Sequence, residues 1–203
     1  MKINTTYVRR LTQLGIVAAM LTIVAAPVAA SAATATTTIS SNVSSVISLL
    51  TTSGTVNVNV TPTGDGAQTV ASDTVTVSTN DTAGYTLQLA ETTAATALTS
   101  GSDTIPAIGG TQASPAALTA NTWGYRVDGA GGFGAGPTAA ASNATIGTTT
   151  FAAVPATGAP DTIKTTASAA ANDTTTVWYA VATNTNQPTG TYTNSVTYTA
   201  TAN

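Results

Sequence analysis

Few side chains in this chain can take part in covalent or acid–base chemistry. The 203-residue sequence contains no His and no Cys, so it lacks the usual base at neutral pH, the thiol nucleophile and the common ligands of transition metals. Ser-His-Asp and Cys-His catalytic arrangements are therefore excluded, as are zinc sites built on those ligands. The remaining candidates are eight carboxylates: Asp65, Asp73, Asp81, Glu91, Asp103, Asp128, Asp161 and Asp173.

Two carboxylates together could hydrolyse a glycoside, and carboxylates in loops could hold a structural calcium ion. Most of these acids stand in turn-forming contexts beside Gly or Asn, where an Asp side chain bonds to its own backbone. The chain also has no Asp-x-Asp-x-Asp-Gly run of the kind that forms a calcium loop. We therefore predict that the protein is not an enzyme and has no catalytic residue, no cofactor and no metal ligand. A glycan-processing enzyme and a structural calcium site are the alternatives left open.

Three further motifs could suggest chemistry. Residues 129–134 satisfy the dinucleotide-binding pattern G-x-G-x-x-G, but Ala135-Gly136-Pro137 is incompatible with the helix that must follow, so we predict a glycine-rich loop. Residues 154–158 resemble a sortase sorting signal, but a β-rich region follows them and we interpret them as a turn. Lys164 is either an ordinary solvated side chain or the donor of an internal bond to an Asn side chain beside a buried acid.

The N-terminus has the three parts of a secretory signal. Lys2, Arg9 and Arg10 precede the apolar stretch 14–26, and Ala30-Ser31-Ala32 fits the small-x-small rule for cleavage. As a helix that stretch would span only about 20 Å, less than the ~30 Å hydrocarbon core of a membrane. We predict a signal peptide over residues 1–32, cleaved after Ala32 or a neighbouring residue. A single domain over residues 33–203 would then be secreted to the extracellular side or the cell surface, with no transmembrane anchor after cleavage.

Removal of the signal leaves an acidic chain. The signal holds three of the five basic residues and none of the acids, so Arg126 and Lys164 face eight carboxylates, a net charge of −6. This charge excludes nucleic-acid binding, which depends on neutralising phosphates. An exported chain without Cys is also typical of bacterial surface β-domains rather than of small disulfide-bonded ones.

Threonine dominates the composition, with 47 residues, and charged residues make up only 6%. Because Thr is β-branched and tolerates half-exposed strands, this composition favours a sheet. Alternation of apolar and polar residues predicts strands over 55–60, 123–127, 177–181 and 192–200, and a hairpin over 73–90. Residues 45–50 could be a strand or a helical turn, and 91–120 and 129–176 are predicted to hold long loops with weak strands near 151–154 and 162–166. We therefore predict an all-β fold, an antiparallel β-sandwich or jelly-roll-like single domain.

Two segments resemble the WxL-type surface domain of bacteria. Val75-Thr76-Val77 leads through a turn to Gly84-Tyr85-Thr86-Leu87 and then to Leu98-Thr99-Ser100-Gly101, and Gly190-Thr191-Tyr192 runs into a last strand at 196–200. The family has Trp where this chain has Tyr85 and Tyr198, and Leu where it has Ala200. The resemblance implies export by a signal peptide and non-covalent association with the cell wall.

Five residues are candidate ligand contacts: Tyr85, Leu87, Tyr198, Trp123 and Trp178. The aromatic ones could equally fill core positions. We predict a non-catalytic, secreted or envelope-associated structural or adhesion module, whose partners are cell-wall polysaccharide, peptidoglycan or other surface proteins. The alternative is a pilin-like or surface-layer subunit that assembles by β-strand addition, with the Thr/Ser-rich segment 34–45 as a donated strand.

Overall fold

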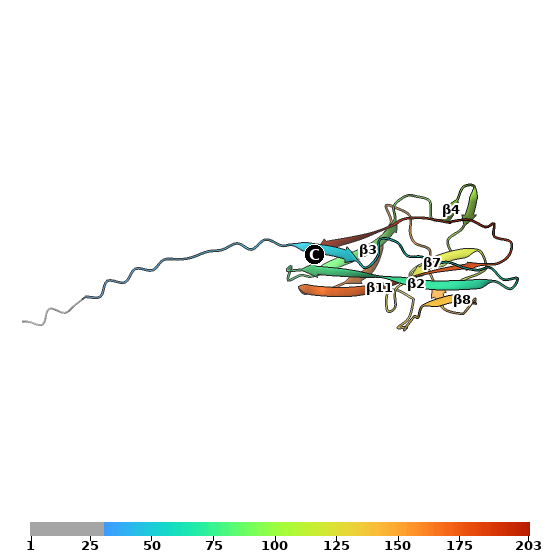
Figure 1. The fold of residues 1–203 in the computed structure, drawn as a ribbon. Coiled ribbons are helices and arrows are strands. Elements are labelled where there is room, and N and C mark those ends of the chain that lie inside the picture. The colour runs from blue at the N-terminus through green and yellow to red at the C-terminus, as the bar shows by residue number, and fades with distance from the viewer. Residues whose placement is uncertain (1–30) are drawn as a thin grey trace, which may run out of the picture. The chain divides into compact units, whose positions relative to one another are not determined.

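The computed structural model describes residues 31–203, which contain strands, turns and extended segments but no helix. The predicted signal, residues 1–32, lies outside the described residues except for its last two. The chain divides into two compact units, Met1–Asn42 and Val43–Asn203, and all the strands lie in the second (Figure 1). Over residues 31–203 there is no helix with the length and apolarity needed to cross a membrane.

Within residues 31–203, twelve strands form two principal antiparallel sheets and two small two-stranded ribbons. In chain order the strands are β1 (Ile47–Thr51), β2 (Ala67–Thr79), β3 (Tyr85–Glu91), β4 (Leu98–Ser100), β5 (Asp103–Ile105), β6 (Ala116–Ala117), β7 (Thr122–Arg126), β8 (Ala141–Thr145), β9 (Thr150–Phe151), β10 (Asp161–Thr165), β11 (Ala170–Thr183) and β12 (Val196–Ala202). The larger sheet has the order β1-β2-β11-β7, with β8 also paired to β2, and the smaller has the order β10-β3-β12. The predicted all-β fold and β-sandwich are confirmed.

The two sheets pack face to face around the first core. Its side chains come from alternate positions of the strands, as the period of two requires: Val75 and Val77 of β2, Val177, Tyr179 and Val181 of β11, Tyr85, Leu87 and Leu89 of β3, and Trp123 and Tyr125 of β7. β2 and β11 are the longest strands and run side by side through the length of the larger sheet (Figure 1).

A second core lies on the opposite face of the larger sheet. The intervening residues of β11, Trp178, Ala180 and Ala182, contribute to it together with Val70 of β2. Ile108 and Leu118 from the loops and Phe151 of β9 complete it. Consequently the C-terminal half of β11 is covered on both faces. Period-two patterning alone predicts only one buried face for such a strand.

The predicted hairpin over residues 73–90 is wrong. β2 and β3 do not pair; they belong to different sheets, and the turn at 80–84 carries the chain from one layer to the other. The reason is that Thr79, at the end of β2, already pairs with Ile47 of β1 on one edge and with Ala170 of β11 on the other. No edge of β2 is left for β3 at this point, so Tyr85 starts a strand in the facing sheet.

The predicted strand over residues 55–60 is also not formed. This segment is extended but has no strand partner. Asp73 ends the pairing of β1 with β2, because its Oδ1 accepts hydrogen bonds from the amides of Thr52 (3.1 Å) and Ser53 (3.2 Å). Further along the same edge of β2, Ala67 and Gln68 pair with β8 instead.

The other predicted strands are found, with shifted limits. The run at 123–127 corresponds to β7, 177–181 to part of β11, and 192–200 to β12, whose apolar positions are half-buried and whose Thr positions are exposed. The ambiguous segment 45–50 contains β1, a strand. The weak strands are β9 and β10, whereas β8 and the first half of β11 lie within stretches that were predicted to be mainly loop.

Gly84 at the layer-crossing turn provides a test of this topology. It has φ +88°, and a Cβ there would collide with the Thr166 carbonyl group; Gly129 has a similar φ of +81° but open space around it. We expect Gly129→Ala to cost about 1–2 kcal/mol of left-handed strain. Gly84→Ala should lose roughly a further 1–3 kcal/mol because the neighbouring strand must shift. Urea unfolding of both variants measures the difference, and equal losses would contradict the close packing of the turn.

Candidate functional site

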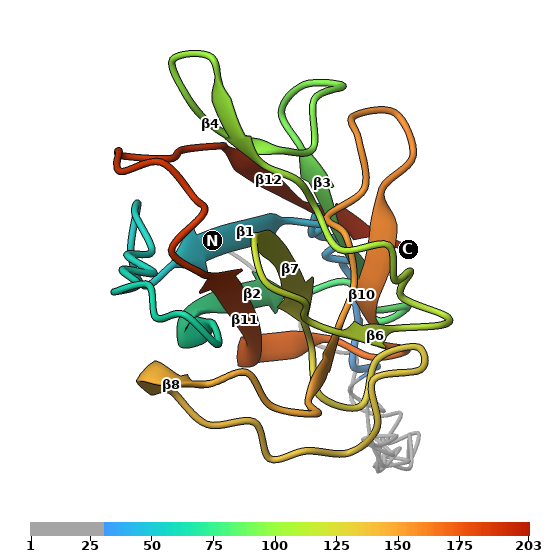
Figure 2. The same cartoon turned by 90° about the vertical axis from the view of Figure 1, so that its right-hand side faces the viewer.

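A groove of about 860 Å³ opens between two extended segments at one rim of the sandwich. One wall is formed by residues 53–60, which follow β1, and the other by residues 187–196, which lead into β12. Figure 2 shows these two segments, coloured cyan-green and red, on the same side of the sandwich. The floor consists of core residues that reach the opening, among them Trp123, Tyr179 and Val181.

A pair of tyrosines joins the two sheets at this floor. The hydroxyl groups of Tyr179 on β11 and Tyr198 on β12 are 2.6 Å apart. Burial raises the pKa of both hydroxyls above the ordinary value of Tyr, and the pKa of Tyr179 is raised further by Tyr198, Asp73 and Glu91. Both groups are therefore neutral at physiological pH and act as hydrogen-bonding groups rather than as bases.

Glu91 is the least satisfied polar side chain of this region. It is 1% exposed, and neither carboxyl oxygen has a hydrogen-bond partner among the described residues. Burial raises the pKa of Glu91 to about 8, so its side chain is mostly protonated at neutral pH. Glu91 does not line the groove. Its carboxyl group is therefore a buried acid behind the tyrosine pair rather than a group presented to a ligand.

Sequence reasoning did not single out Glu91 or Asp73. The alternation that identified Tyr85, Leu87 and Leu89 continues to Glu91, so the sequence placed a carboxyl group on the buried face of the strand. Asp73 lies within β2 and is 4% exposed. When the same alternation is applied to charged residues, it predicts that the side chains of both Asp73 and Glu91 are buried.

Two of the candidate contact residues, Tyr85 and Leu87, belong to the first core and are 0% exposed. The Tyr85 hydroxyl donates a hydrogen bond to Oδ2 of Asp173 (2.8 Å), and burial together with this carboxylate raises the pKa of Tyr85. The structure therefore favours core packing over ligand contact for this pair.

The other three candidates do not lie together: Trp123 of the larger sheet and Tyr198 of the smaller sheet face the first core, whereas Trp178 packs against the second. Trp123 and Tyr198 line the groove, although Trp123 is 4% exposed and its Nε1 donates to the carbonyl oxygen of Thr96 (2.9 Å). Trp178 points to the second core, where it is half-buried. The five residues thus do not form one site, and only Trp123 and Tyr198 share the groove.

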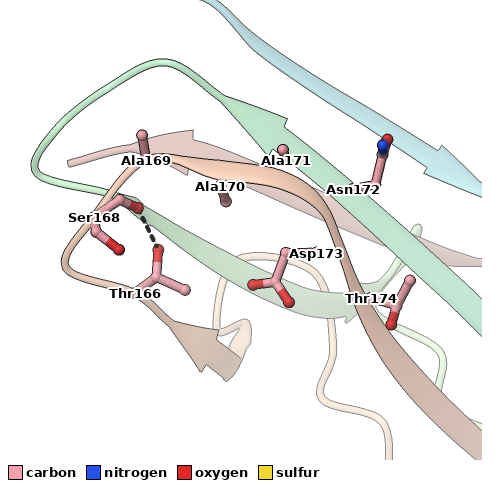
Figure 3. A pocket seen from close by; sticks show the side chains of 8 residues that line it. All are labelled: Thr166, Ser168, Ala169, Ala170, Ala171, Asn172, Asp173 and Thr174. Carbon is pink, nitrogen blue, oxygen red and sulfur yellow. Dashed lines mark hydrogen bonds between the residues drawn. The ribbon is translucent and has the colours of Figure 1, made fainter.

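A second, shallower depression of about 390 Å³ lies at the start of β11, and its lining includes Asp173 and Thr174 (Figure 3). Lys164 contacts both of these residues. Its Nζ is 2.6 Å from Oδ1 of Asp173 and 3.1 Å from the carbonyl oxygen of Thr174. Burial opposes ionisation of Asp173, but the hydrogen bonds from Lys164 and Tyr85 outweigh it and lower the pKa. Lys164 therefore makes an ion pair with an Asp, and its nearest polar partners include no Asn side chain, contrary to the geometry that an internal Lys–Asn bond requires.

The second cation holds the glycine-rich loop. Nε of Arg126, which is buried, lies 2.6 Å from Oδ1 of Asp128, and the amide of Thr138 donates to Oδ2 at 2.7 Å. These bonds close the loop that contains residues 129–136. No helix follows this loop. The structure confirms that this is a loop and not a dinucleotide-binding turn.

No group of three or more acidic side chains comes together anywhere in residues 31–203. Asp128 and Asp173 are each engaged with a cation, at Arg126 and Lys164. A structural calcium ion remains a prediction that these contacts do not test.

The buried acid predicts a distinctive pH dependence. Because the pKa of Glu91 is about 8 in the folded chain and 4.5 without burial, the folded state retains a proton that the unfolded state loses. We expect the free energy of unfolding to fall by about 1.4 kcal/mol per pH unit between roughly pH 5 and pH 8, and to level off above that. Glu91→Gln should abolish this slope in urea unfolding at several pH values.

The matched control is Asp103→Asn, which removes an exposed carboxyl group and should leave the slope in place. An identical slope in the Glu91→Gln protein would show that the carboxyl group is not held in its neutral form.

Comparison of the chain with models of known families, with characterised proteins and with solved structures found no match. The resemblance to the WxL-type domain therefore stays a prediction carried by two segments. The surface feature that this chain offers for a function is the rim groove between residues 53–60 and 187–196.

Proposed function

We propose that the protein is a non-catalytic, exported module of the cell envelope, with a structural or adhesive role. The observation that carries this proposal is the exposed outer face of the smaller sheet. On β12 every second residue is an exposed Thr, and on β3 the outward positions are Thr86, Gln88 and Ala90. This face offers hydroxyl and amide groups in a regular array and no charge.

Such a face suits an uncharged, hydroxyl-rich partner. Polysaccharide chains present hydroxyl groups at short intervals, and neutral hydrogen bonds formed at a wet interface contribute modestly one by one but add up over a repeating surface. The cell-wall polysaccharide or peptidoglycan expected from the sequence has this chemistry. The absence of His and Cys, together with the engagement of Asp73 by the amides of Thr52 and Ser53, supports binding rather than catalysis.

A second function, assembly into a fibre or surface layer, is favoured by a different observation. Residues 31–46 are extended and unpaired with any strand, and their apolar side chains are exposed. A segment of this kind could add to the sheet edge of another molecule. Wall binding and assembly use different surfaces of the chain, so one protein could do both.

Wall binding is tested by sedimentation of the purified exported chain with purified peptidoglycan sacculi. Thr199 pairs with Gln88 at the centre of the proposed face, and Thr199→Arg would place a long charged side chain across it. We expect this variant to lose at least tenfold in apparent affinity.

Thr176→Arg is the matched control, because Thr176 is an equally exposed strand Thr on the larger sheet. Equal binding by both variants would exclude this face as the contact. A parent protein that stays in the supernatant would overturn wall binding itself, and fractionation of the native cells would then show where the protein resides.

A further inference from the structure

We propose that the rim groove accepts residues 33–43 of a second copy of this chain as an added β-strand. This inference rests on the second proposed function, assembly, and specifies its two partners: the groove between residues 53–60 and 187–196 as the acceptor, and the segment 33–43 as the donor.

The acceptor has an open strand edge. Within residues 54–60, Val56, Val58 and Val60 are half-buried against the first core, whereas Thr55, Asn57 and Asn59 are exposed. This alternation is that of a β-strand, so the amides and carbonyls point sideways along the rim. Yet no backbone-to-backbone hydrogen bond joins residues 54–60 to any other part of the described chain; two of their carbonyl oxygens accept only side-chain hydroxyl groups, Thr55 from Ser53 and Asn59 from Thr69 (2.7 Å). The segment has strand geometry without a strand partner.

The opposite wall of the groove, formed by residues 187–196, also has a main-chain edge. Thr193 exchanges two main-chain hydrogen bonds with Thr99, each 3.0 Å long, on the side of β4. Its other side lines the groove. A strand placed between residues 54–60 and 191–195 would therefore find main-chain partners on both sides, while Val181, Tyr192 and Val196 line the space for its side chains.

The donor has the sequence of an amphipathic strand. Its odd positions include Ala33, Ala35, Ile39 and Val43, and its even positions are all Thr, Ser or Asn. This period of two is the pattern of a strand with one buried face. In the structure that face is uncovered, with Ile39 92% and Val43 79% exposed. The whole stretch 31–64 carries no charged side chain, so neither donor nor rim segment opposes pairing by charge.

Geometry favours a second copy over the chain's own segment. The segment joins the sandwich at the Asn80 turn, where Asn80 accepts from the amide of Val46 and donates to the carbonyl of Ser44. The groove begins at the other end of β1, near Thr51. The length of β1 separates the two points by about 17 Å. A chain that turned back at Val43 would use roughly five residues to cover this distance.

Only residues 33–37 could then reach the chain's own groove, leaving Ile39 and Val43 outside it. In the groove of another copy both side chains can be buried. Because the donor and the acceptor are different surfaces, each copy can give one strand and receive one. Such a head-to-tail contact is heterologous and extends into an open chain unless rotation closes it.

The absence of Cys allows a direct test with the purified exported chain. One copy carries Ile39→Cys and the other, with a different tag, carries Val58→Cys, and the mixture is treated with a short thiol-specific cross-linker. We expect the mixed dimer to exceed by at least tenfold that from Ile39→Cys mixed with Ala159→Cys, a loop position outside the groove. No excess over this control would overturn the proposal.

Two further measurements complete the test. The parent protein should form concentration-dependent oligomers in sedimentation velocity, whereas Ile39→Asp/Val43→Asp should stay monomeric with an unchanged melting temperature, because both side chains are exposed. A parent that is monomeric at all concentrations, or a double variant Ile39→Cys/Val58→Cys that cross-links only within one chain, would overturn it. Sedimentation with sacculi is independent of these outcomes, so strand addition and wall binding can fail separately.

Discussion

The pairing of β2 with β11 is the interaction on which the rest of the structure depends. Twelve residue pairs join the two strands over almost their whole length, and every other element is placed by what this ladder leaves available. Alternate residues of β11 enter the two cores: Tyr179 and Val181 pack between the sheets, and Ala180 and Ala182 pack on the far face. The small size of these alanines matters, because loops from 106–120 and 146–152 can then approach the sheet closely without a second sheet to cover it.

The same ladder explains the rim. β1 and β8 pair with separate stretches of the same edge of β2. The segment that follows β1 leaves this edge at Asp73. Residues 53–60 therefore pack their apolar side chains against the first core without pairing with a neighbouring strand. The hydrogen bond between Tyr179 and Tyr198, which both line the groove, joins β11 to β12 beside this segment. A groove with two strand edges results from this geometry, and no special sequence motif is needed to form it.

Strand identity could be predicted from the sequence more reliably than strand pairing. Alternation identified β7, β12 and the central part of β11 because apolar side chains stand at every second position of each. The same alternation gave a false hairpin at 73–90 and a false strand at 55–60, because it reports which side chains are buried and not which edge is available. The site was harder still: Tyr85 and Tyr198 look alike in sequence, yet one is fully enclosed and the other lines the groove. That difference depends on contacts between residues far apart in the sequence, such as Tyr85 with Asp173 and Tyr198 with Leu89.

Edge strands in monomeric proteins are usually guarded by charged side chains, proline or bulges, since an open edge pairs readily with another chain. The rim segment of this chain, residues 53–60, has few of these protective features. From residue 31 to residue 64 there is no charge, and the rim segment carries Asn and Thr on its exposed face, with proline only at its end, at Pro62. One acid, Asp73, lines the groove, but it is buried and its Oδ1 accepts hydrogen bonds from the amides of Thr52 and Ser53. Asp128 and Asp173 are engaged with cations, and Glu91 is buried within the sandwich. An edge left without these protections, in a chain that also carries an uncharged amphipathic segment, has the physical requirements of a pairing surface, and this supports assembly as a function that the fold itself makes possible.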